Sequence, residues 1–235
     1  MTPYTPKSMK RTGLSGLILF AMLFLARPAA GQDYNYSVQH DSVAWQELNN
    51  QTLCNTVNVA WESSYTISIG FPFTYLGQSF DSVRIETNGY LCFGGNHQYS
   101  FMAFTGFGDQ IDSSGLHSVL GYSRSGSGNN AILKLQYKNV SRSYMQDFLS
   151  YQLWIYADGR IAIVTGPSQM PQDTSFAMHL GLVNRMMDTP DCGFLLSGNY
   201  TQPTSQPVTN TTAELPVLSF VPVQGHRFVF VPGSN

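Results

Sequence analysis

Two carboxylate pairs come closest to the types and spacing that catalysis requires. Asp109 and Asp112 are three residues apart, as are Asp188 and Asp191. Glycoside hydrolysis needs two carboxyl groups about 5–9.5 Å apart across a cleft. Asp109 and Asp112 also suit Ca²⁺, which takes about six to eight oxygen ligands. The commoner role of such residues is to cap turns in a loop, so all three roles stay open.

The histidines form no metal site in the sequence, and no nucleophile motif accompanies them. None of the 5 histidines pairs with another at i, i+2 or i, i+4, and none joins Cys or acidic residues at zinc-ligand spacing. There is no G-x-S-x-G elbow and no glycine-rich phosphate loop that opens a helix. The sequence therefore predicts no catalytic residue and no required cofactor, with Ca²⁺ at Asp109 and Asp112 as the alternative.

Aromatic side chains are the better candidates for contact with a ligand. Exposed rings stack on sugar rings and anchor protein contacts, although alternating aromatic residues are more often part of a core. Six of them crowd one segment or lie on or beside expected strands: Trp61, Tyr99, Phe101, Phe104, Phe107 and Trp154. Trp154 is of special interest, because Tyr151, Leu153 and Ile155 alternate onto the opposite face of its strand.

The chain has 3 cysteines, so one thiol is left over if a disulfide forms. Cys92 lies within an expected strand and reads as a small packed residue. Cys54 and Cys192 lie near expected loops. In an oxidising compartment we expect the disulfide to join Cys54 and Cys192.

The first 31 residues read as a signal peptide. Lys7, Lys10 and Arg11 precede an apolar run of about a dozen residues, shorter than the ~20 that span a bilayer. Small residues follow the run, which predicts cleavage between Gly31 and Gln32. A retained membrane anchor is the alternative. Export places the protein outside the cell, at its surface or in the periplasm.

The remaining chain is poor in charge and weakly acidic. Four of the 12 basic residues precede Gln32, which leaves eight basic residues against 14 acidic ones. No cluster of Lys and Arg appears among them. This balance argues against nucleic acid or an anionic membrane as a partner.

Strand signals recur through the whole exported part. Residues 131–137 alternate, with Leu133, Leu135 and Tyr137 on one face and Lys134 and Gln136 on the other. Asn88-Gly89 and Asp158-Gly159 mark tight hairpins, and for the first we expect a two-residue type I′ turn. About a dozen short strands between turn signals indicate an antiparallel β-sandwich, lectin-like or jelly-roll-like. We expect residues 32–235 to form one domain, with the Ser/Thr/Pro-rich residues 197–216 as a long surface loop.

The segment FPFTYLGQSFDSVRIETNGYLCFGG, residues 71–95, resembles a motif of secreted proteins from bacteria with type IX secretion. It falls in their N-terminal β-sandwich domain, and its opening also resembles nidogen-type extracellular domains. Pieces further along resemble the same domain in order, among them ILKLQYKNV (residues 132–140), YQLWIYADGRIAIVTG (residues 151–166) and GHRFVFVP (residues 225–232). The resemblance implies a β-sandwich of adhesion or lectin type whose ligand is unassigned.

These observations favour an exported, non-catalytic module for binding or adhesion, with a glycan or a protein at the cell surface as its ligand. Fold alone does not establish that role. A glycan-active hydrolase and a structural component of the cell envelope are the alternatives.

Overall fold

The computed structural model describes residues 36–55, 63–95, 97–104, 117–141, 147–169, 177–184, 192–209, 211–219 and 223–233. The predicted signal peptide and its cleavage site at Gly31 and Gln32 lie outside this range. Tyr34–Asn235 forms one compact unit. Its regular structure is nearly all strand, with one short 3₁₀ helix at Gly128–Asn130 among the described residues.

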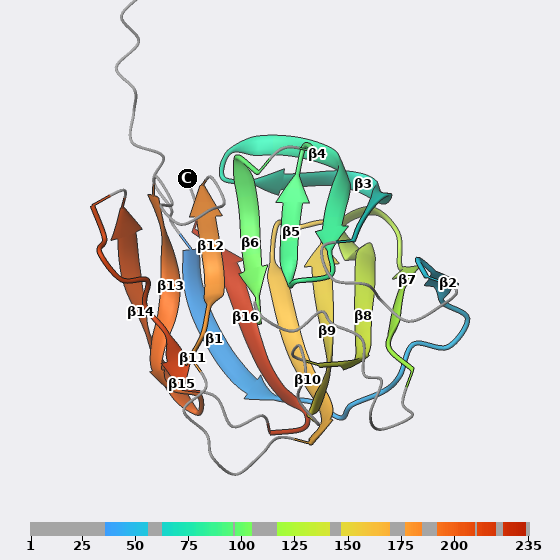
Figure 1. Ribbon diagram of the computed structural model, residues 1–235. Coiled ribbons are helices and arrows are strands. Elements are labelled where there is room, and N and C mark those ends of the chain that lie inside the picture. The colour runs from blue at the N-terminus through green and yellow to red at the C-terminus, as the bar shows by residue number, and fades with distance from the viewer. Residues whose placement is uncertain are drawn as a thin grey trace, which may run out of the picture. The chain divides into compact units, whose positions relative to one another are not determined.

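Two sheets, antiparallel apart from one short parallel contact, pack face to face, which confirms the expected β-sandwich (Figure 1). The seven-stranded sheet runs in the spatial order β1 (Tyr36–Ser42), β16 (His226–Pro232), β10 (Ile161–Gln169), β9 (Phe148–Tyr156), β8 (Ile132–Val140), β7 (Val119–Ser125) and β2 (Thr52–Leu53). The nine-stranded sheet runs in the order β11 (Ala177–Met178), β15 (Leu218–Ser219), β13 (Cys192–Asn199), β12 (Leu180–Asn184), β6 (Tyr99–Ala103), β5 (Tyr90–Phe93), β4 (Gln78–Glu86) and β3 (Ser64–Tyr75), and β14 (Gln202–Thr209) also pairs with β13.

The alternation of apolar residues decides which face of each strand enters the core. On β8, Leu133, Leu135 and Tyr137 are fully buried between the sheets, as the sequence predicts. Aromatic rings from both sheets meet there. Tyr137 stacks on Tyr151 with ring centroids 4.5 Å apart, and Phe101 of the nine-stranded sheet meets the edge of Phe230 at 4.9 Å. The first contact lies within the seven-stranded sheet, and the second joins the two layers.

The hairpins form where expected, but the Asn88-Gly89 turn differs from the prediction. Strand β4 ends at Glu86 and β5 begins at Tyr90, so three residues rather than two form the loop. Only Gly89 has a positive φ, of 92°, and its N–H donates to the carbonyl of Glu86 at 3.1 Å. A type I′ turn needs positive φ at both central residues. The chain meets that requirement elsewhere, at Leu76 (50°) and Gly77 (74°) between β3 and β4.

The Ser/Thr/Pro-rich residues 197–216 are not one long loop, and that prediction is wrong. Strand β14 lies within them and pairs with β13 from Cys192↔Thr209 to Asn199↔Gln202. Pro203 and Pro207 belong to β14. Proline cannot donate to a ladder, but an edge strand tolerates it because one row of its N–H groups faces away from the partner strand. Among the described strands β14 pairs with β13 only.

The first and last strands of the unit lie side by side. Strand β16 lies between β1 and β10, and its pairing with β1 runs from Tyr36↔Pro232 to Ser42↔His226 (blue and red in Figure 1). The edge of the seven-stranded sheet is therefore built from segments about two hundred residues apart.

Candidate functional site

The outer face of the seven-stranded sheet carries a row of side chains that are neighbours across the strands. Lys134 pairs with Trp154, Trp154 with Ala162, Ala162 with Val229, and Val229 with Gln39. Because successive side chains of a strand point to opposite faces, all five lie on the side away from the core. The register thus assembles one surface from five strands.

Residues 43–51, which we call the crossing segment, cover part of this outer face. They connect β1 at one edge of the sheet to β2 at the other. The amide of Gln152 donates to the carbonyl of Gln46 (2.7 Å), and the N–H of Leu48 donates to the side-chain carbonyl of Gln136 (3.0 Å). Gln152 also donates to Gln136 at 2.8 Å. These two buried glutamines hold the crossing segment against the sheet.

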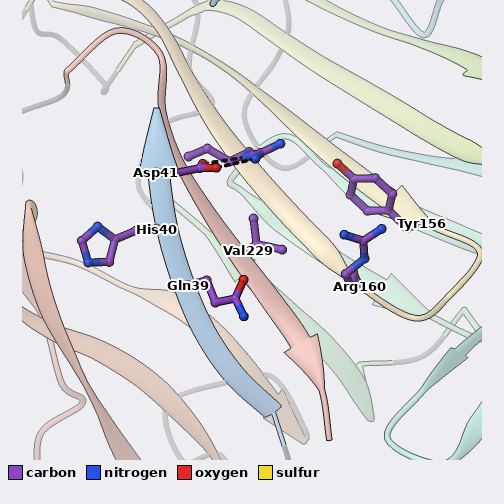
Figure 2. A pocket seen from close by; sticks show the side chains of 7 residues that line it. Gln39, His40, Asp41, Tyr156, Arg160 and Val229 are labelled. Atoms are coloured by element: carbon purple, nitrogen blue, oxygen red, sulfur yellow. Dashed lines mark hydrogen bonds and ion pairs between the residues drawn. The ribbon is translucent and has the colours of Figure 1, made fainter. Parts of the chain in front are cut away.

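A pocket of about 150 Å³ lies beside the row, at the edge formed by β1. Figure 2 shows Tyr156 and Arg160 together on one side, with Asp41 and Gln39 on β1 across from them and Val229 between. A ligand pocket for a drug-sized molecule has about 300–1,000 Å³. The volume of this pocket therefore suits one small group of a larger ligand.

The charged groups at the pocket are held in fixed places by pairing. Arg227 donates to both oxygens of Asp41, from Nε to Oδ1 at 2.8 Å and from Nη2 to Oδ2 at 2.5 Å. Arg160 donates from Nε to Asp158 Oδ2 at 2.8 Å. The hydrogen bond from Arg227 lowers the pKa of Asp41, so this carboxyl stays ionised.

Two cations lie over aromatic rings of the same face. The Lys134 Nζ lies 4.0 Å from the centroid of Trp154, and the Arg160 guanidinium carbon lies 4.5 Å from that of Tyr156. The indole N–H of Trp154 donates to Gln152 Oε1 at 2.9 Å, which fixes the orientation of the ring. Partial burial lowers the pKa of Lys134. The outer face of the seven-stranded sheet thus presents cations, amides and aromatic rings whose positions are fixed by these contacts.

The aromatic residues proposed from the sequence have different locations in the structure. Trp154 lies on the outer face just described. Phe101 and Phe104 are fully buried in the core, so their assignment as ligand contacts is wrong: Phe101 lies on the inward side of β6, and Phe104 directly follows that strand into the core. Tyr99 is half-buried against Phe80, with ring centroids 5.2 Å apart. The remaining aromatic candidates, Trp61 and Phe107, and the proposed Ca²⁺ ligands Asp109 and Asp112 lie outside the described residues.

Cys54 and Cys192 are not joined in the structure, contrary to the predicted disulfide. Cys54 follows β2 at the edge of the seven-stranded sheet, and Cys192 begins β13 of the other sheet. In Figure 1 these two strands lie at opposite sides of the unit. A disulfide requires Cα atoms within about 7 Å, which this topology does not provide.

A second cluster lies on the outer face of the nine-stranded sheet, where Glu86, Cys92 and His97 each offer a ligand atom within 4.8 Å of the others. Cys92 Sγ is 3.3 Å from His97 Nδ1 and 3.9 Å from Glu86 Oε1. Arg84 forms an ion pair with Glu86, and its Nη2 is 2.7 Å from His97 Nε2. Burial raises the pKa of the Cys92 thiol to about 11. Within the described part of the chain, these residues are the ones able to hold a metal ion.

Sequence reasoning missed this cluster because its members come from two strands and a turn. Arg84 and Cys92 are opposite each other in the β4–β5 register, and Glu86 lies two residues beyond Arg84 on the same face. His97 is in the turn between β5 and β6. The alternation along the two strands was the available signal. Glu86 and Cys92 flank the Asn88-Gly89 hairpin and are each adjacent to a buried residue, Ile85 and Leu91, so both are expected on the outer face of the sheet.

The fold defines the chain as a two-layer antiparallel β-sandwich module. The chain belongs to the NIDO-related family, which matches residues 35–232. This membership fits a non-catalytic extracellular module in general terms, and it confirms the resemblance to nidogen-type domains. A search of the curated proteins and a search of the solved structures each found no match. The described residues include no helix of the length and apolar character needed to cross a bilayer.

Proposed function

We propose that this protein is an exported, non-catalytic binding or adhesion module that recognises a glycan on the outer face of its seven-stranded sheet. The observation that carries the proposal is the pocket between β1 and the β9–β10 hairpin, with Trp154 beside it. Gln39, Arg160 and Asp41 supply planar polar groups at this place. Such groups present paired donors and acceptors, which match the neighbouring hydroxyls of a sugar ring.

The rings of Tyr156 and Trp154 add apolar surface beside these polar groups. Their centroids are 6.4 Å apart, and each ring belongs to the same strand, β9. A sugar has polar edges and an apolar C–H face, and an aromatic ring suits the latter. The pocket volume accommodates one group of the ligand, so we infer that neighbouring sugars of an oligosaccharide lie along the row toward Lys134.

The electrostatics of the pocket favour binding over glycoside hydrolysis. A general acid in a glycosidase needs a raised pKa so that it keeps its proton near neutral pH. Asp41 has a lowered pKa, and both of its oxygens accept hydrogen bonds from Arg227. Asp158 is likewise engaged by Arg160. These pairings support a role for the carboxylates in positioning the arginines.

Export belongs to the same proposal. The N-terminal signal and the resemblance of residues 71–95 to type IX cargo support a location outside the cell, at its surface or in the periplasm. N-terminal sequencing of the protein recovered from outside the cytoplasm should start at Gln32. A first residue within or before the apolar run would contradict cleavage at Gly31.

The test of ligand class is a glycan-array screen of the purified protein, with and without Ca²⁺. We expect binding to a group of related oligosaccharides, and loss of at least about fivefold in affinity in Trp154→Ala, since stacking contributes about 1–3 kcal/mol in comparable ring contacts. Lys138→Ala is the matched control. It lies on the same face of β8 as Lys134, but its ion pair is with Glu47 of the crossing segment.

Each outcome decides between the function classes. Glycan binding that survives Trp154→Ala would place the ligand elsewhere on the molecule. An array without binding would overturn the glycan ligand and leave a protein partner or an envelope role. Release of sugar from a bound glycan would instead establish the hydrolase.

A further inference from the structure

We propose that Glu86, Cys92 and His97 form a Zn²⁺ site on the outer face of the nine-stranded sheet, and that the Arg84 guanidinium competes with the metal for it. The proposal is independent of the ligand surface on the other sheet. It rests on the donor set, the distances and the burial of the cluster.

The donor set is one that Zn²⁺ favours. Zn²⁺ binds thiolate sulfur at about 2.3 Å, imidazole nitrogen at about 2.0–2.1 Å and carboxylate oxygen at about 2.0–2.2 Å, commonly with four ligands in a tetrahedron. One Cys, one His and one Glu supply one ligand of each kind. Ca²⁺ and Mg²⁺ prefer oxygen ligands, so the sulfur and nitrogen argue for a transition metal.

The distances fit a single ion between the three side chains. Two ligand atoms at tetrahedral angles around zinc lie about 3.3–3.8 Å apart, given those bond lengths. Cys92 Sγ lies 3.3 Å from His97 Nδ1 and 3.9 Å from Glu86 Oε1. His97 Nε2, the other ring nitrogen, lies 3.7 Å from Glu86 Oε1, so the imidazole and the carboxylate must turn for one ring nitrogen, the sulfur and the carboxylate to meet at a single ion. A water molecule can take the fourth position.

The backbone holds the ligands in this arrangement. Cys92 is fully buried on β5, and Glu86 is 6% exposed at the end of β4. The hydroxyl of Ser100 on β6 donates to the carbonyl of His97 at 3.0 Å, and its oxygen lies 3.6 Å from Cys92 Sγ. Ser100 thereby positions both the turn that carries His97 and the sulfur, as residues around metal ligands commonly do.

Arg84 accounts for the charge of the cluster when no metal is bound. A buried carboxylate is costly unless a positive charge is near it. The guanidinium pairs with Glu86, and its Nη2 lies 2.7 Å from His97 Nε2. The Arg84 side chain is 27% exposed, so it can turn outward to solvent. Metal binding then replaces one positive group by another, and the Cys92 thiol releases its proton to solvent as the Zn–S bond forms.

The test uses the purified protein, first stripped of metal with a chelator and then titrated with Co²⁺ and Zn²⁺. We expect one ion per chain, a thiolate-to-cobalt charge-transfer band, and loss of that band when Zn²⁺ displaces Co²⁺. Cys92→Ser should abolish the band, and His97→Ala should weaken Zn²⁺ binding by at least about tenfold, the lower limit for loss of supporting groups around a metal.

Two controls keep the proposal falsifiable. Cys54→Ser removes a cysteine of the other sheet and should leave the cobalt spectrum unchanged. Arg84→Met should tighten Zn²⁺ binding, because it removes the competing cation. The site is refuted if metal-stripped wild type and Arg84→Met both bind less than one ion per chain, or if Cys92→Ser keeps the charge-transfer band. Circular dichroism shows whether each variant has folded. If a ligand variant has not folded, the titrations of the wild type and of Arg84→Met test the site in its place.

Discussion

The outer faces of the two sheets differ in how they arrange their polar side chains. On the seven-stranded sheet, side chains from five strands form a row with the polar groups of Lys134 and Gln39 at its two ends, and the crossing segment covers only part of this face. On the nine-stranded sheet, four polar side chains from β4, β5 and the following turn converge on one point, where Cys92 is fully buried. The first arrangement offers a surface to a large ligand, whereas the second offers a small, closely spaced set of donors suited to an ion.

The comparison indicates that the segment lying over the outer face of a sheet determines which kind of site forms there. Both faces follow from the same strand alternation, which only requires that polar residues point away from the core. The crossing segment lies flat on the first sheet and leaves a pocket beside it. The turn after β5 brings His97 to the sulfur of Cys92 on the second sheet.

Arg84→Met in the metal-free protein should give the largest effect on stability. Without its partner, the buried Glu86 keeps an uncompensated charge, and we expect a loss of about 2–3 kcal/mol in the free energy of unfolding, somewhat below fully buried pairs because Arg84 is partly exposed. Urea denaturation measures the loss. The double variant Arg84→Met with Glu86→Gln should recover most of the lost stability. If neither Glu86→Gln nor added Zn²⁺ restores the stability of Arg84→Met, the charges of this cluster do not balance as described.

Gln152→Ala should follow, with a loss of about 1–3 kcal/mol from the buried groups that remain without partners. The variant removes the donor to the Gln46 carbonyl and the acceptor for the Trp154 indole N–H. Denaturation gives the stability, and indole fluorescence reports the freed ring. Gln46→Ala is the matched control: its side chain is exposed and only its carbonyl is used, so it should be nearly neutral. A large effect of the control would show that the crossing segment is held in another way.

Acidification should destabilise the edge of the seven-stranded sheet by a smaller amount. Burial and the nearby His40 lower the pKa of His226, while Asp41 opposes the shift. Arg227 follows His226 in the sequence, and the ring of Tyr200 packs on the imidazole of His226. A lowered folded pKa means that stability is fully present above the unfolded value of about 6.5 and is lost as pH falls through the folded value.

The melting temperature measured between about pH 8 and about pH 5 tests this dependence, because the range spans the ordinary His pKa. His226→Phe should flatten the part of the profile that lies below the unfolded pKa. An unchanged slope in that variant would assign the acid sensitivity to other groups.

Lys134→Met should have the smallest effect on stability, about 0.5 kcal/mol, the lower end of the range for a cation over a ring, because Lys134 keeps part of its contact with solvent. Lys138→Met, which removes the exposed pair with Glu47, should cost a similar amount. Glycan affinity should separate the two, with only the Lys134 variant weakened. Equal affinities would mean that the ligand does not reach the row at Lys134.

The sequence predicts the elements of this fold well because alternation is local. The inward set Leu133, Leu135 and Tyr137 is confirmed, and Lys134 lies outward as expected. Gln136 also points outward but is buried, since the crossing segment lies over it. Coverage of this kind depends on segments far apart in the chain and leaves no local pattern.

The candidate sites were harder to predict for the same reason. The alternation of its strand alone predicts that Trp154 points outward, but Arg227, whose guanidinium carbon lies 5.9 Å from the indole ring, and Gln39 of the adjoining pocket come from the two ends of the domain. The cluster at Cys92 depends on the β4–β5 register and on a turn that no linear motif marks. Proline in β14 was read as a loop signal, although an edge strand accommodates it.

The position of β16 between β1 and β10 sets an order of assembly. Among the described strands of its sheet, β1 pairs with β16 alone, so it stays unpaired until almost the whole domain has been synthesised. Contacts between such distant segments carry a large loop-closure entropy and slow folding. Until β1 has paired with β16, both strands expose unpaired backbone edges, and these are the places where the incomplete sheet is prone to aggregate.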